Sequence, residues 1–515
     1  MSTQVSPTTG EPLSPVAWTS VEEIPAIIER ARAAQSAWSA KSLSERSRAI
    51  RDLAQAVLAG HEEIATILSQ ETGKSFDEAL LNEISGIADY AKMAIREAEA
   101  ALAPVRPAIS RTAYPGKSAV IEAVPRGVVG IIAPWNYPLS IFYKPLFPAL
   151  LSGNAVVLKP SEFTPRTGAW LAARCQEVLG ADLVGLVQGA GREGAALLEG
   201  GIDAVTFTGS VPTGRKIAAR AGELLIPASV ELGGKDAAIV LADCDLDRTA
   251  AGITQWALHN CGQNCAAIER VYVEESIADA FAERLAALFK TIRVAPAEEG
   301  HSDISPLQNE MQLSIVKSHV EDALDKGAKI LAGGEPTGRG LGFQATCLDH
   351  CDESMLVVTE ETFGPLVAIC RVKDADEAVR RANASPYGLN GSVWTRDIRR
   401  GEAIARRLNV GIALVNNHAI GGMIAGIPWT GTGDTGPGIA ASRFSYPTFV
   451  RRKTIFIDKN RAPDPWWFPF NDDSRELANH LIAFSSGSLT AVFGLAGAAK
   501  KRLRAVQAWS RASKP

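Results

Sequence analysis

Cys265, Glu231 and Asn136 are the residues of this 515-residue chain whose types and surroundings best suit chemistry on a carbonyl group. Cys265 lies in a short polar turn, Gly262-Gln263-Asn264-Cys265-Ala266, after the mostly apolar segment 253–261. A nucleophilic thiol needs the access and the hydrogen-bond donors that such a turn supplies, whereas a structural cysteine usually sits within an apolar periodic run. An inert core cysteine remains the alternative when this segment is taken alone.

Glu231 and Asn136 each follow a predicted strand. Glu231 precedes Gly233-Gly234-Lys235, where burial could make its carboxylate a general base. Asn136 lies in Pro134-Trp135-Asn136-Tyr137-Pro138 and offers an uncharged amide donor to a developing oxyanion, while Trp135 and Tyr137 could form the wall of a pocket. Singly, each of these motifs could also be structural.

Two glycine-containing turns could bind a dinucleotide. The segment 189–194 matches the G-x-G-x-x-G pattern, but the next strand lacks the Asp or Glu that such sites carry about twenty residues further on. The second turn is more suitable, because Gly209 lets a phosphate approach the backbone and Ser210 can donate its hydroxyl. A helix with Pro212 near its start also supplies N–H groups there. An ordinary capped turn is the alternative for this segment.

Lys159 and Glu162 end another predicted strand, in Leu158-Lys159-Pro160-Ser161-Glu162. Lys159 could hydrogen-bond ribose hydroxyls, and Glu162 could accept a hydrogen bond from an adenosine 2′-hydroxyl while repelling a 2′-phosphate. This pair therefore favours NAD over NADP, with an exposed salt-bridging pair as the alternative.

The elements that must position these residues follow from periodicity. Residues 21–59 and 61–103 carry apolar positions at helical spacing and predict a helical layer. Short apolar runs then alternate with helical segments, which is typical of a parallel sheet covered by helices on both faces. These runs lie at 119–124, 128–132, 155–158, 183–187, 204–207 and 237–241. A second series of the same kind follows from Leu246 to about Val415, then a glycine-rich loop at 421–438 and a last strand at 454–458.

Length and composition indicate an ordinary globular protein of at least two domains. The net charge of -4 gives no reason to expect a nucleic acid partner. Seven cysteines, few and odd in number, predict a reducing compartment without disulfides. Neither the pair at 261 and 265 nor the pair at 347 and 351 has the companion ligands of a zinc site, so no metal is expected. The polar segment 1–10 does not resemble a secretory signal, and we expect a cytoplasmic location.

Six motifs in this order resemble the motif set of the NAD(P)-dependent aldehyde dehydrogenase superfamily. They lie at 134–138, 159–162, 209–214, 231–235, 262–265 and 360–365, and the similarity extends from about Ser6 to about Asp458. The resemblance implies an α/β fold with a Rossmann-variant cofactor domain, a second α/β catalytic domain and a small β oligomerisation domain. The implied boundaries are 1–103 with 125–232 for the NAD-binding domain, 233–428 for the catalytic domain, and 104–124 with 429–458 for the oligomerisation elements. A homodimer or homotetramer is then expected.

The resemblance also implies a role for each motif. Cys265 would add to an aldehyde to give a thiohemiacetal, with the oxyanion bound by Asn136 and by the Cys265 backbone N–H. Hydride transfer to NAD would leave a thioester, which water deprotonated by Glu231 would hydrolyse to a carboxylic acid. The implied cofactor-binding residues are Trp135, Lys159, Glu162, Gly189, Gly209, Ser210, Gly214, Glu361 and Phe363.

Two other functions remain open at this point. In a CoA-acylating relative, CoA would receive the acyl group in place of water, although Glu231 argues against this because many such relatives lack that base. A non-catalytic protein that retained the fold is the second alternative, and the presence of Asn136, Glu231 and Cys265 argues against it.

Two segments depart from the pattern of the family. The glycine loop at 428–438 lacks the second Gly, the Lys and the Arg of many relatives, which leaves the substrate open. Lys144, His259 and Asn264 fall where relatives line the aldehyde tunnel and could indicate an anionic or polar substrate.

The C-terminal extension, 459–515, contains nineteen uncharged residues, 481–499, followed by a basic segment. An amphipathic helix is expected here, with its apolar face formed by Leu489, Val492, Phe493, Ala496, Ala499, Leu503, Val506 and Trp509. Packing on the enzyme or its partner subunit, attachment to a membrane surface as a peripheral protein, and a true bilayer span are three possible roles.

Overall fold

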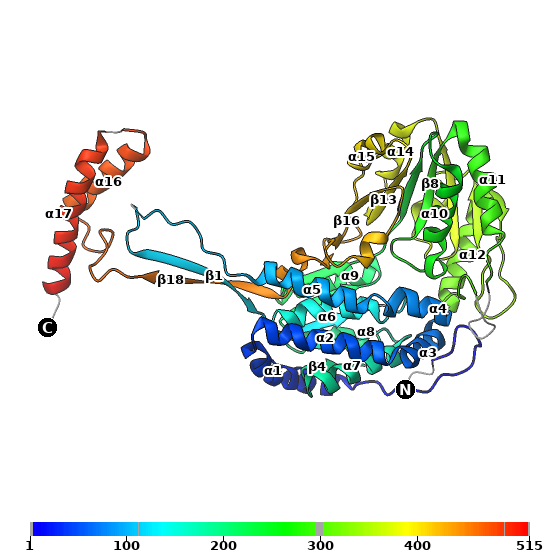
Figure 1. Ribbon diagram of the computed structural model, residues 1–515, viewed down its shortest axis with the longest axis horizontal. Helices are drawn as coiled ribbons and strands as arrows, with labels where there is room; N and C mark the ends of the chain where they lie inside the picture. Colours follow the sequence, from blue (N-terminus) through cyan, green and yellow to red (C-terminus); the bar gives the residue numbers. More distant parts are fainter. Residues whose placement is uncertain (1–3, 112, 295–301, 489, 513–515) are drawn as a thin grey trace. The chain divides into compact units, whose positions relative to one another are not determined.

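The computed structural model describes residues 4–111, 113–294, 302–488 and 490–512 (Figure 1). The chain forms two compact units. Unit 1 comprises Met1–Ala103 and Ala123–Arg451, and unit 2 comprises Pro104–Glu122 and Arg452–Pro515. The finer boundary between a cofactor domain and a catalytic domain within unit 1 stays a prediction.

The N-terminal part of unit 1 is helical, as its periodicity predicts, but each predicted segment is divided. The elements are α1 (Ile24–Ala40), α2 (Leu43–Ala59), α3 (His61–Thr72), α4 (Phe76–Ala79), the π-helical η2 (Leu80–Ile84) and α5 (Ile87–Leu102). Ser42 starts α2 because its hydroxyl accepts from the Glu45 N–H while the Glu45 carboxylate accepts from the Ser42 N–H. Gly73 ends α3 in the left-handed conformation, with φ at 73°.

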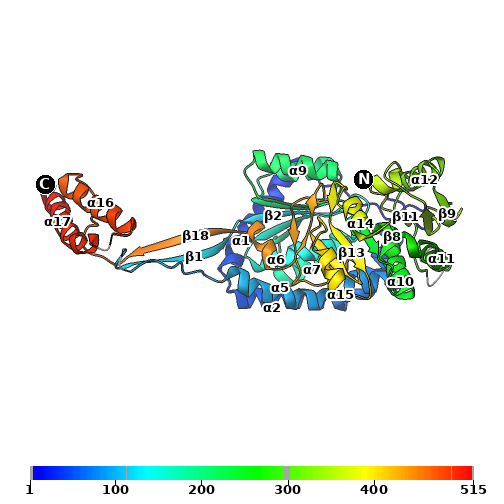
Figure 2. The same cartoon turned by 90° about the horizontal axis from the view of Figure 1, so that it is seen from above.

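The first sheet of unit 1 is fully parallel. Its strands are β2 (Val128–Ile132), β3 (Ala155–Lys159), β4 (Val184–Leu186), β5 (Ala204–Thr208) and β6 (Ala228–Glu231), in the order β4-β3-β2-β5-β6. The crossover helices are α6 (Ser140–Leu151), α7 (Pro165–Leu179), α8 (Gly191–Glu199) and α9 (Val211–Glu223). Figure 2 shows α9 and α2 on opposite sides of β2. Because helices cover both faces, its central strands read as continuous apolar runs.

The second sheet of unit 1 has seven strands in the order β14-β13-β7-β8-β11-β10-β9, and only β9 is antiparallel to its neighbour. The strands are β7 (Asp236–Val240), β8 (Ile268–Glu274), β9 (Lys329–Ala332), β10 (Thr346–Asp349), β11 (Leu366–Val372), β13 (Asn390–Trp394) and β14 (Ile412–Val415). The helices are α10 (Leu246–Leu258), α11 (Ala278–Phe289), α12 (Glu310–Asp325), α13 (Leu356–Thr359), α14 (Ala375–Ala382) and α15 (Ile398–Ala405). The run at 237–241, expected with the first series, therefore belongs to the second sheet, because the chain changes sheets between Glu231 and Asp236.

The glycine-rich segment at 421–438 is more ordered than the predicted loop. It includes β15 (Trp429–Thr430) and β16 (Thr432–Gly433), which pair with β17 (Ile439–Ala440) and β12 (Tyr387–Gly388) respectively. Short backbone ladders therefore hold Trp429 in a defined position.

The strands β1 (Lys117–Pro125) and β18 (Val450–Asp458), most of whose residues belong to unit 2, form a two-stranded sheet. The last strand therefore begins four residues before its predicted start. The extension forms two helices, α16 (Asp472–Ser485) and α17 (Ala491–Ala512), rather than one. No helix among the described residues combines the length and the apolar character that crossing a bilayer requires.

The apolar face predicted for the extension is also wrong in part. Val492, Phe493 and Ala496 are exposed, whereas the buried residues of α17 are Ala491, Ala498, Arg502 and Val506. Leu489, assigned to the same face, lies outside the described residues. The contact with α16 therefore selects a different side of the helix from the one that the apolar pattern indicates.

Candidate active site

The carboxyl ends of the parallel strands of the first sheet meet at one edge. The register pairs Ile132 with both Lys159 and Phe207, and it pairs Thr208 with Glu231. The segments that follow β2, β3 and β5 therefore begin at the edge where β6 ends. The predicted site residues at or just beyond these strand ends are Asn136, Lys159, Glu162, Gly189, Gly209, Ser210 and Glu231.

The turn that carries Cys265 has an unusual backbone. It follows the 3-10 segment η3 (His259–Gly262), in which Asn260 has φ at 55° and Gly262 has φ at 67°. A Cβ atom on Gly262 would lie 2.0 Å from the carbonyl oxygen of Gly364. Glycine is therefore required at this position both by conformation and by space.

The turn of Cys265 is joined to the loop of Asn136 by side-chain amides. Asn260 Nδ2 donates to the carbonyl oxygens of Asn136, at 3.0 Å, and Gln263, at 2.9 Å. Asn136 Nδ2 donates to the same Gln263 oxygen at 3.1 Å. The Oδ1 atom of Asn136 is buried and has no partner among the described residues. An amide nitrogen has two N–H groups, so Asn136 retains one donor for a ligand.

A buried ion pair supports the Asn136 loop from behind. Lys74 and Glu83 are fully buried and joined at 2.6 Å. Lys74 also donates to the carbonyl oxygen of Asn136. Glu83 accepts from the backbone N–H groups of Leu139, at 2.9 Å, and Ser140, at 3.2 Å. The pair therefore connects the N-terminal helices to both sides of the turn that presents Asn136.

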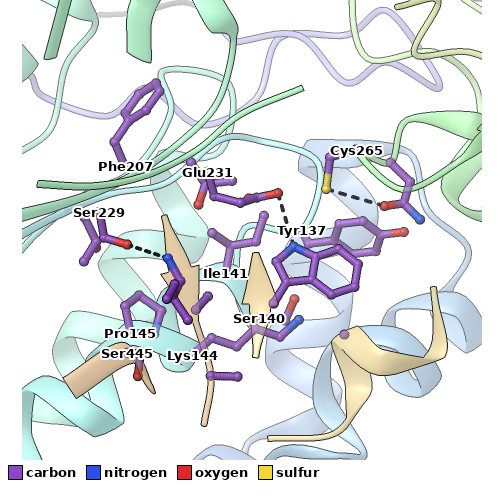
Figure 3. Close-up of a pocket in the computed structure, with 18 of the residues that line it drawn as sticks. Tyr137, Ser140, Ile141, Lys144, Pro145, Phe207, Ser229, Glu231, Cys265 and Ser445 are labelled. Atoms are coloured by element: carbon purple, nitrogen blue, oxygen red, sulfur yellow. Dashed lines mark hydrogen bonds between the residues drawn. The ribbon is translucent and has the colours of Figure 1, made fainter. Parts of the chain in front are cut away.

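Cys265 and Glu231 face each other in the pocket drawn in Figure 3. Burial, together with the negative charge of Glu231, raises the pKa of the Cys265 thiol well above its usual value. The thiol also lies 3.9 Å from the Asn264 amide oxygen, to which it can donate. Burial and the charge of Glu231 both disfavour the thiolate form of Cys265.

Glu231 ends β6 and is held by Trp429. The indole Nε1–H of Trp429 donates to Glu231 Oε1 at 3.2 Å. Burial raises the pKa of Glu231, and the indole hydrogen bond and the charge of Lys144 oppose that rise. Glu231 is therefore a carboxylate with an elevated pKa next to a nucleophile, as a general base requires.

Gly209, Ser210 and Gly214 lie at the start of α9. Ser210 is the N-cap residue of this helix, is exposed, and makes no side-chain capping bond, so the first N–H groups of α9 remain available to an anion. A Cβ atom on Gly214 would lie 2.1 Å from Leu232, and one on Gly209 would lie 2.6 Å from the Phe207 ring. A side chain at either position would therefore have to displace a neighbouring side chain.

Gly189 lies in a turn whose neighbouring backbone N–H group is already hydrogen-bonded to a side chain. Gly189 has φ at 145°, and the neighbouring Ala190 N–H donates to the Glu193 carboxylate at 2.8 Å. Glu193 therefore occupies the start of α8, where an anion would have to bind. On the adjacent strand, burial lowers the pKa of Lys159 while Glu162 and Glu193 raise it. Two carboxylates, those of Glu162 and Glu193, therefore lie near the Lys159 ammonium group.

Glu361, Phe363 and Trp135 are three of the predicted cofactor-binding residues. Glu361 Oε1 accepts from the Gly234 N–H at 2.9 Å, and burial, with the nearby Glu269, raises the pKa of Glu361 to about 8. The Trp135 and Phe363 rings meet edge to face, with centroids 5.5 Å apart. The structure therefore brings Trp135 and Phe363 together, on the two loops that follow β2 and precede β11.

A profile of the aldehyde dehydrogenase family matches residues 2–455, which is most of the chain. The chain belongs to the aldehyde dehydrogenase family. This confirms the resemblance carried by the six motifs, and with it the expected α/β fold.

Two similar aldehyde dehydrogenase relatives carry names that point to different substrates. A Mycobacterium ulcerans protein, provisionally named succinate-semialdehyde dehydrogenase [NADP(+)] 2, is 37% identical over 84% of this chain and 83% of its own length. The 4,4'-diapolycopene aldehyde oxidase of Methylomonas sp is 35% identical over 90% of this chain and 88% of its own length. Both names describe enzymes that act on aldehydes.

Solved structures of aldehyde dehydrogenases have the same fold. The NAD-dependent enzyme of Sinorhizobium meliloti is 33% identical, with a TM-score of 0.84 over 90% of this chain and 92% of that chain. The Bacillus cereus enzyme in complex with NAD+ is 29% identical, with a TM-score of 0.83 over 89% of this chain and 93% of that chain. A nicotinamide cofactor is therefore expected for the family. The Mycobacterium ulcerans relative is named for NADP(+) and the two solved structures are named for NAD, so the names do not decide between the two cofactors.

Sequence reasoning missed the supporting contacts of this aldehyde dehydrogenase site. Lys74 lies between α3 and α4 and Glu83 lies in η2, and neither was singled out because no local pattern marks them as a buried pair. Trp429 was noted only within the altered glycine loop. Its hydrogen bond to Glu231 spans 198 positions and has no local signal.

Proposed function

We propose that the protein oxidises an aldehyde to a carboxylic acid with NAD, through a thiohemiacetal and then a thioester on Cys265. The observation that carries this proposal is the Cys265 thiol facing the Glu231 carboxylate in one pocket. The turn of Cys265 is also joined to the loop of Asn136 through Asn260. A nucleophile, a base and an oxyanion donor are thus within one small region.

Covalent addition requires that Cys265 lose its proton. Because the pKa of the thiol is raised, the proton must move as sulfur attacks the carbonyl carbon, and Glu231 is the carboxylate placed to accept it. The carbonyl oxygen becomes anionic as the C–S bond forms. The second N–H of Asn136 and the backbone N–H of Cys265 bind that oxygen.

Hydrolysis then releases the product. Once the thiohemiacetal carbon has lost a hydride, the acyl group is held on Cys265 as a thioester. Glu231 first releases the thiol proton to solvent and so becomes a carboxylate again. It then removes a proton from water as the water oxygen attacks the acyl carbon. The C–S bond breaks, the sulfur recovers a proton, and a carboxylic acid leaves.

The residues at the sheet edge fit a dinucleotide. The uncapped start of α9, with Gly209 and Ser210, suits a pyrophosphate, and Lys159 suits ribose hydroxyls. Trp135, Glu361 and Phe363 would contact the nicotinamide end. When bound, the cofactor supplies the hydride acceptor. The Glu162 and Glu193 carboxylates near Lys159 disfavour a 2′-phosphate, so we propose NAD rather than NADP.

Lys144 suggests the class of aldehyde. It lines the pocket, where burial lowers its pKa and the nearby Cys265 and Glu231 partly oppose that fall. Figure 3 shows its side chain near that of Ser140. A cation in this position favours substrates with a second, anionic group. Lys144→Met would then raise the KM for acidic aldehydes and leave that for neutral aldehydes of equal length nearly unchanged.

We further propose a homodimer or homotetramer. Phe456 and Ile457 of β18 are 58% and 46% exposed, and a two-stranded sheet is marginally stable by itself. Light scattering after size-exclusion chromatography tests this proposal. A monomer at micromolar concentration would contradict it.

The deciding experiment measures NADH formation, without CoA, over a panel of short, long-chain, aromatic and acidic aldehydes. The expected result is NADH with an equal amount of carboxylic acid, and loss of both in Cys265→Ala. Cys244→Ala, in a buried cysteine outside the pocket, is the matched control and should stay active. Turnover that requires CoA, or that survives in Cys265→Ala, would contradict the proposal.

A further inference from the structure

The helical hairpin formed by α16 and α17 exposes apolar side chains where the two helices are connected. Near the end of α16, Ile482 is 64% exposed and Phe484 is 48% exposed. At the start of α17, Val492 is 44% exposed and Phe493 is 89% exposed. Figure 1 shows this connection at the end of the hairpin opposite the C terminus. We call these four residues the apolar tip.

One exposed face of α17 is basic. Lys500, Arg504 and Arg511 follow Phe493 at helical spacings, so they share its side of the helix. All three are exposed, and none pairs with a carboxylate among the described residues. The helix contains no Asp or Glu. We call these three residues the basic face.

The opposite side of α17 is used by the hairpin itself. Arg502 is fully buried and donates to the carbonyl oxygens of Pro465, at 2.9 Å, and Trp467. Lys501 pairs with Asp473 and Glu476 of α16, each at 3.0 Å. These contacts fix the orientation of α17 about its own axis, so that one side of the helix packs against α16. The apolar tip and the basic face therefore remain exposed.

Aromatic side chains are also exposed in the segment before α16. Trp466 is 44% exposed, Trp467 is 52% exposed and Phe470 is 70% exposed. Tryptophan is favoured at the boundary between headgroups and acyl chains, because its ring is apolar and its N–H is polar. The segment 459–515 carries nine Lys and Arg against four Asp and Glu, although the whole chain has a net charge of -4.

We propose that the surface of a bilayer containing anionic phospholipids covers this hairpin. The apolar tip enters the outer acyl region, while the basic face lies among the headgroups. Charge complementarity favours an anionic membrane surface over a second copy of the chain as the partner of this hairpin. In a two-fold contact with a second copy, the basic face of one chain would approach the same basic face of the other.

The test is flotation of the full-length protein with vesicles of phosphatidylcholine alone or with added phosphatidylglycerol, at physiological salt. The protein should float with the anionic vesicles and remain in solution with the neutral ones. Lys500→Glu/Arg504→Glu should lower the partition coefficient by at least about tenfold, and Phe484→Ser/Phe493→Ser should lower it by a similar factor.

Matched control variants show whether a loss of vesicle binding is specific to the apolar tip and the basic face, or whether any change of surface charge or of an exposed apolar side chain causes it. Lys317→Glu/Arg399→Glu makes the same charge change at exposed positions of unit 1. Leu225→Ser removes a side chain that is 91% exposed there. Both controls should bind vesicles as the wild-type protein does. The melting temperature and the light-scattering mass of every variant are measured in parallel.

Three results would overturn the proposal. The first is a folded wild-type protein that floats with neither vesicle, and the second is equal loss of flotation in the control variants. The third is a change of oligomeric state in the hairpin variants with unchanged flotation, which would assign the surface to a second copy of the chain. None of these readouts depends on the proposed enzymatic activity.

Discussion

Trp429 donates its indole N–H to Glu231 Oε1 at 3.2 Å. Trp429 belongs to β15, in the segment where the sequence departs from many relatives, and Glu231 ends β6 at the edge of the first sheet. The contact orients the carboxylate and opposes the rise in its pKa that burial causes. Trp429 is therefore a positioning residue for the proposed base.

Replacing Trp429 by Phe should move the acidic limb of the pH profile of kcat to higher pH. The substitution removes a hydrogen bond to the charged form, so the pKa of Glu231 rises further, and the base is then protonated over a wider acidic range. The profile is measured under conditions in which thioester hydrolysis limits turnover. Trp256→Phe is the control, since that indole lines the same pocket but donates to Asn417. An unchanged acidic limb in Trp429→Phe would refute the positioning role.

Asn136→Ala should lower kcat/KM by about 10²- to 10³-fold, the usual effect of losing one oxyanion donor. Rapid-mixing measurement of the first turnover should place the loss in the step that forms the thioester. Asn82→Ala, a change of the same kind in the lining of the pocket that holds Cys265 and Glu231, should have little effect. Equal losses in the two variants would mean that pocket shape, rather than hydrogen bonding to the oxyanion, is responsible.

Lys74→Met should destabilise the protein by about 3–5 kcal/mol, because it leaves the fully buried Glu83 without its ion-pair partner. It should also lower kcat, since Lys74 donates to the backbone of Asn136. Urea unfolding and steady-state kinetics measure the two effects. Lys74→Met/Glu83→Leu should recover much of the stability but not the activity, whereas recovery of both would show that the pair is structural only.

Glu162→Gln should raise the NADP to NAD ratio of kcat/KM by about tenfold, or about 1.4 kcal/mol, because it removes a charge that would repel a 2′-phosphate. Initial rates with each cofactor measure the ratio. Glu177→Gln, at the far end of the following helix, is the control for charge alone. Equal shifts in the two variants would show that Glu162 has no specific role in choosing the cofactor.

Much of the arrangement followed from local signals. The predicted runs at 155–158 and 204–207 lie within β3 and β5. Site residues follow strand ends, and parallel strands end at a common edge, so the order of motifs predicted their proximity. Periodicity alone did not separate the run at 237–241 from the first series, because an apolar run has the same periodicity in either sheet.

The sequence by itself determined the element types, the order of the motifs and the family, because periodicity and motif spacing are properties of neighbouring residues. Only the tertiary structure decided that Trp429 reaches Glu231, that Lys74 pairs with Glu83 beneath Asn136, and which side of α17 is buried. These features depend on side chains distant along the chain. Their partners are chosen by burial and hydrogen bonding once the sheets and helices have packed, and no local pattern records that choice.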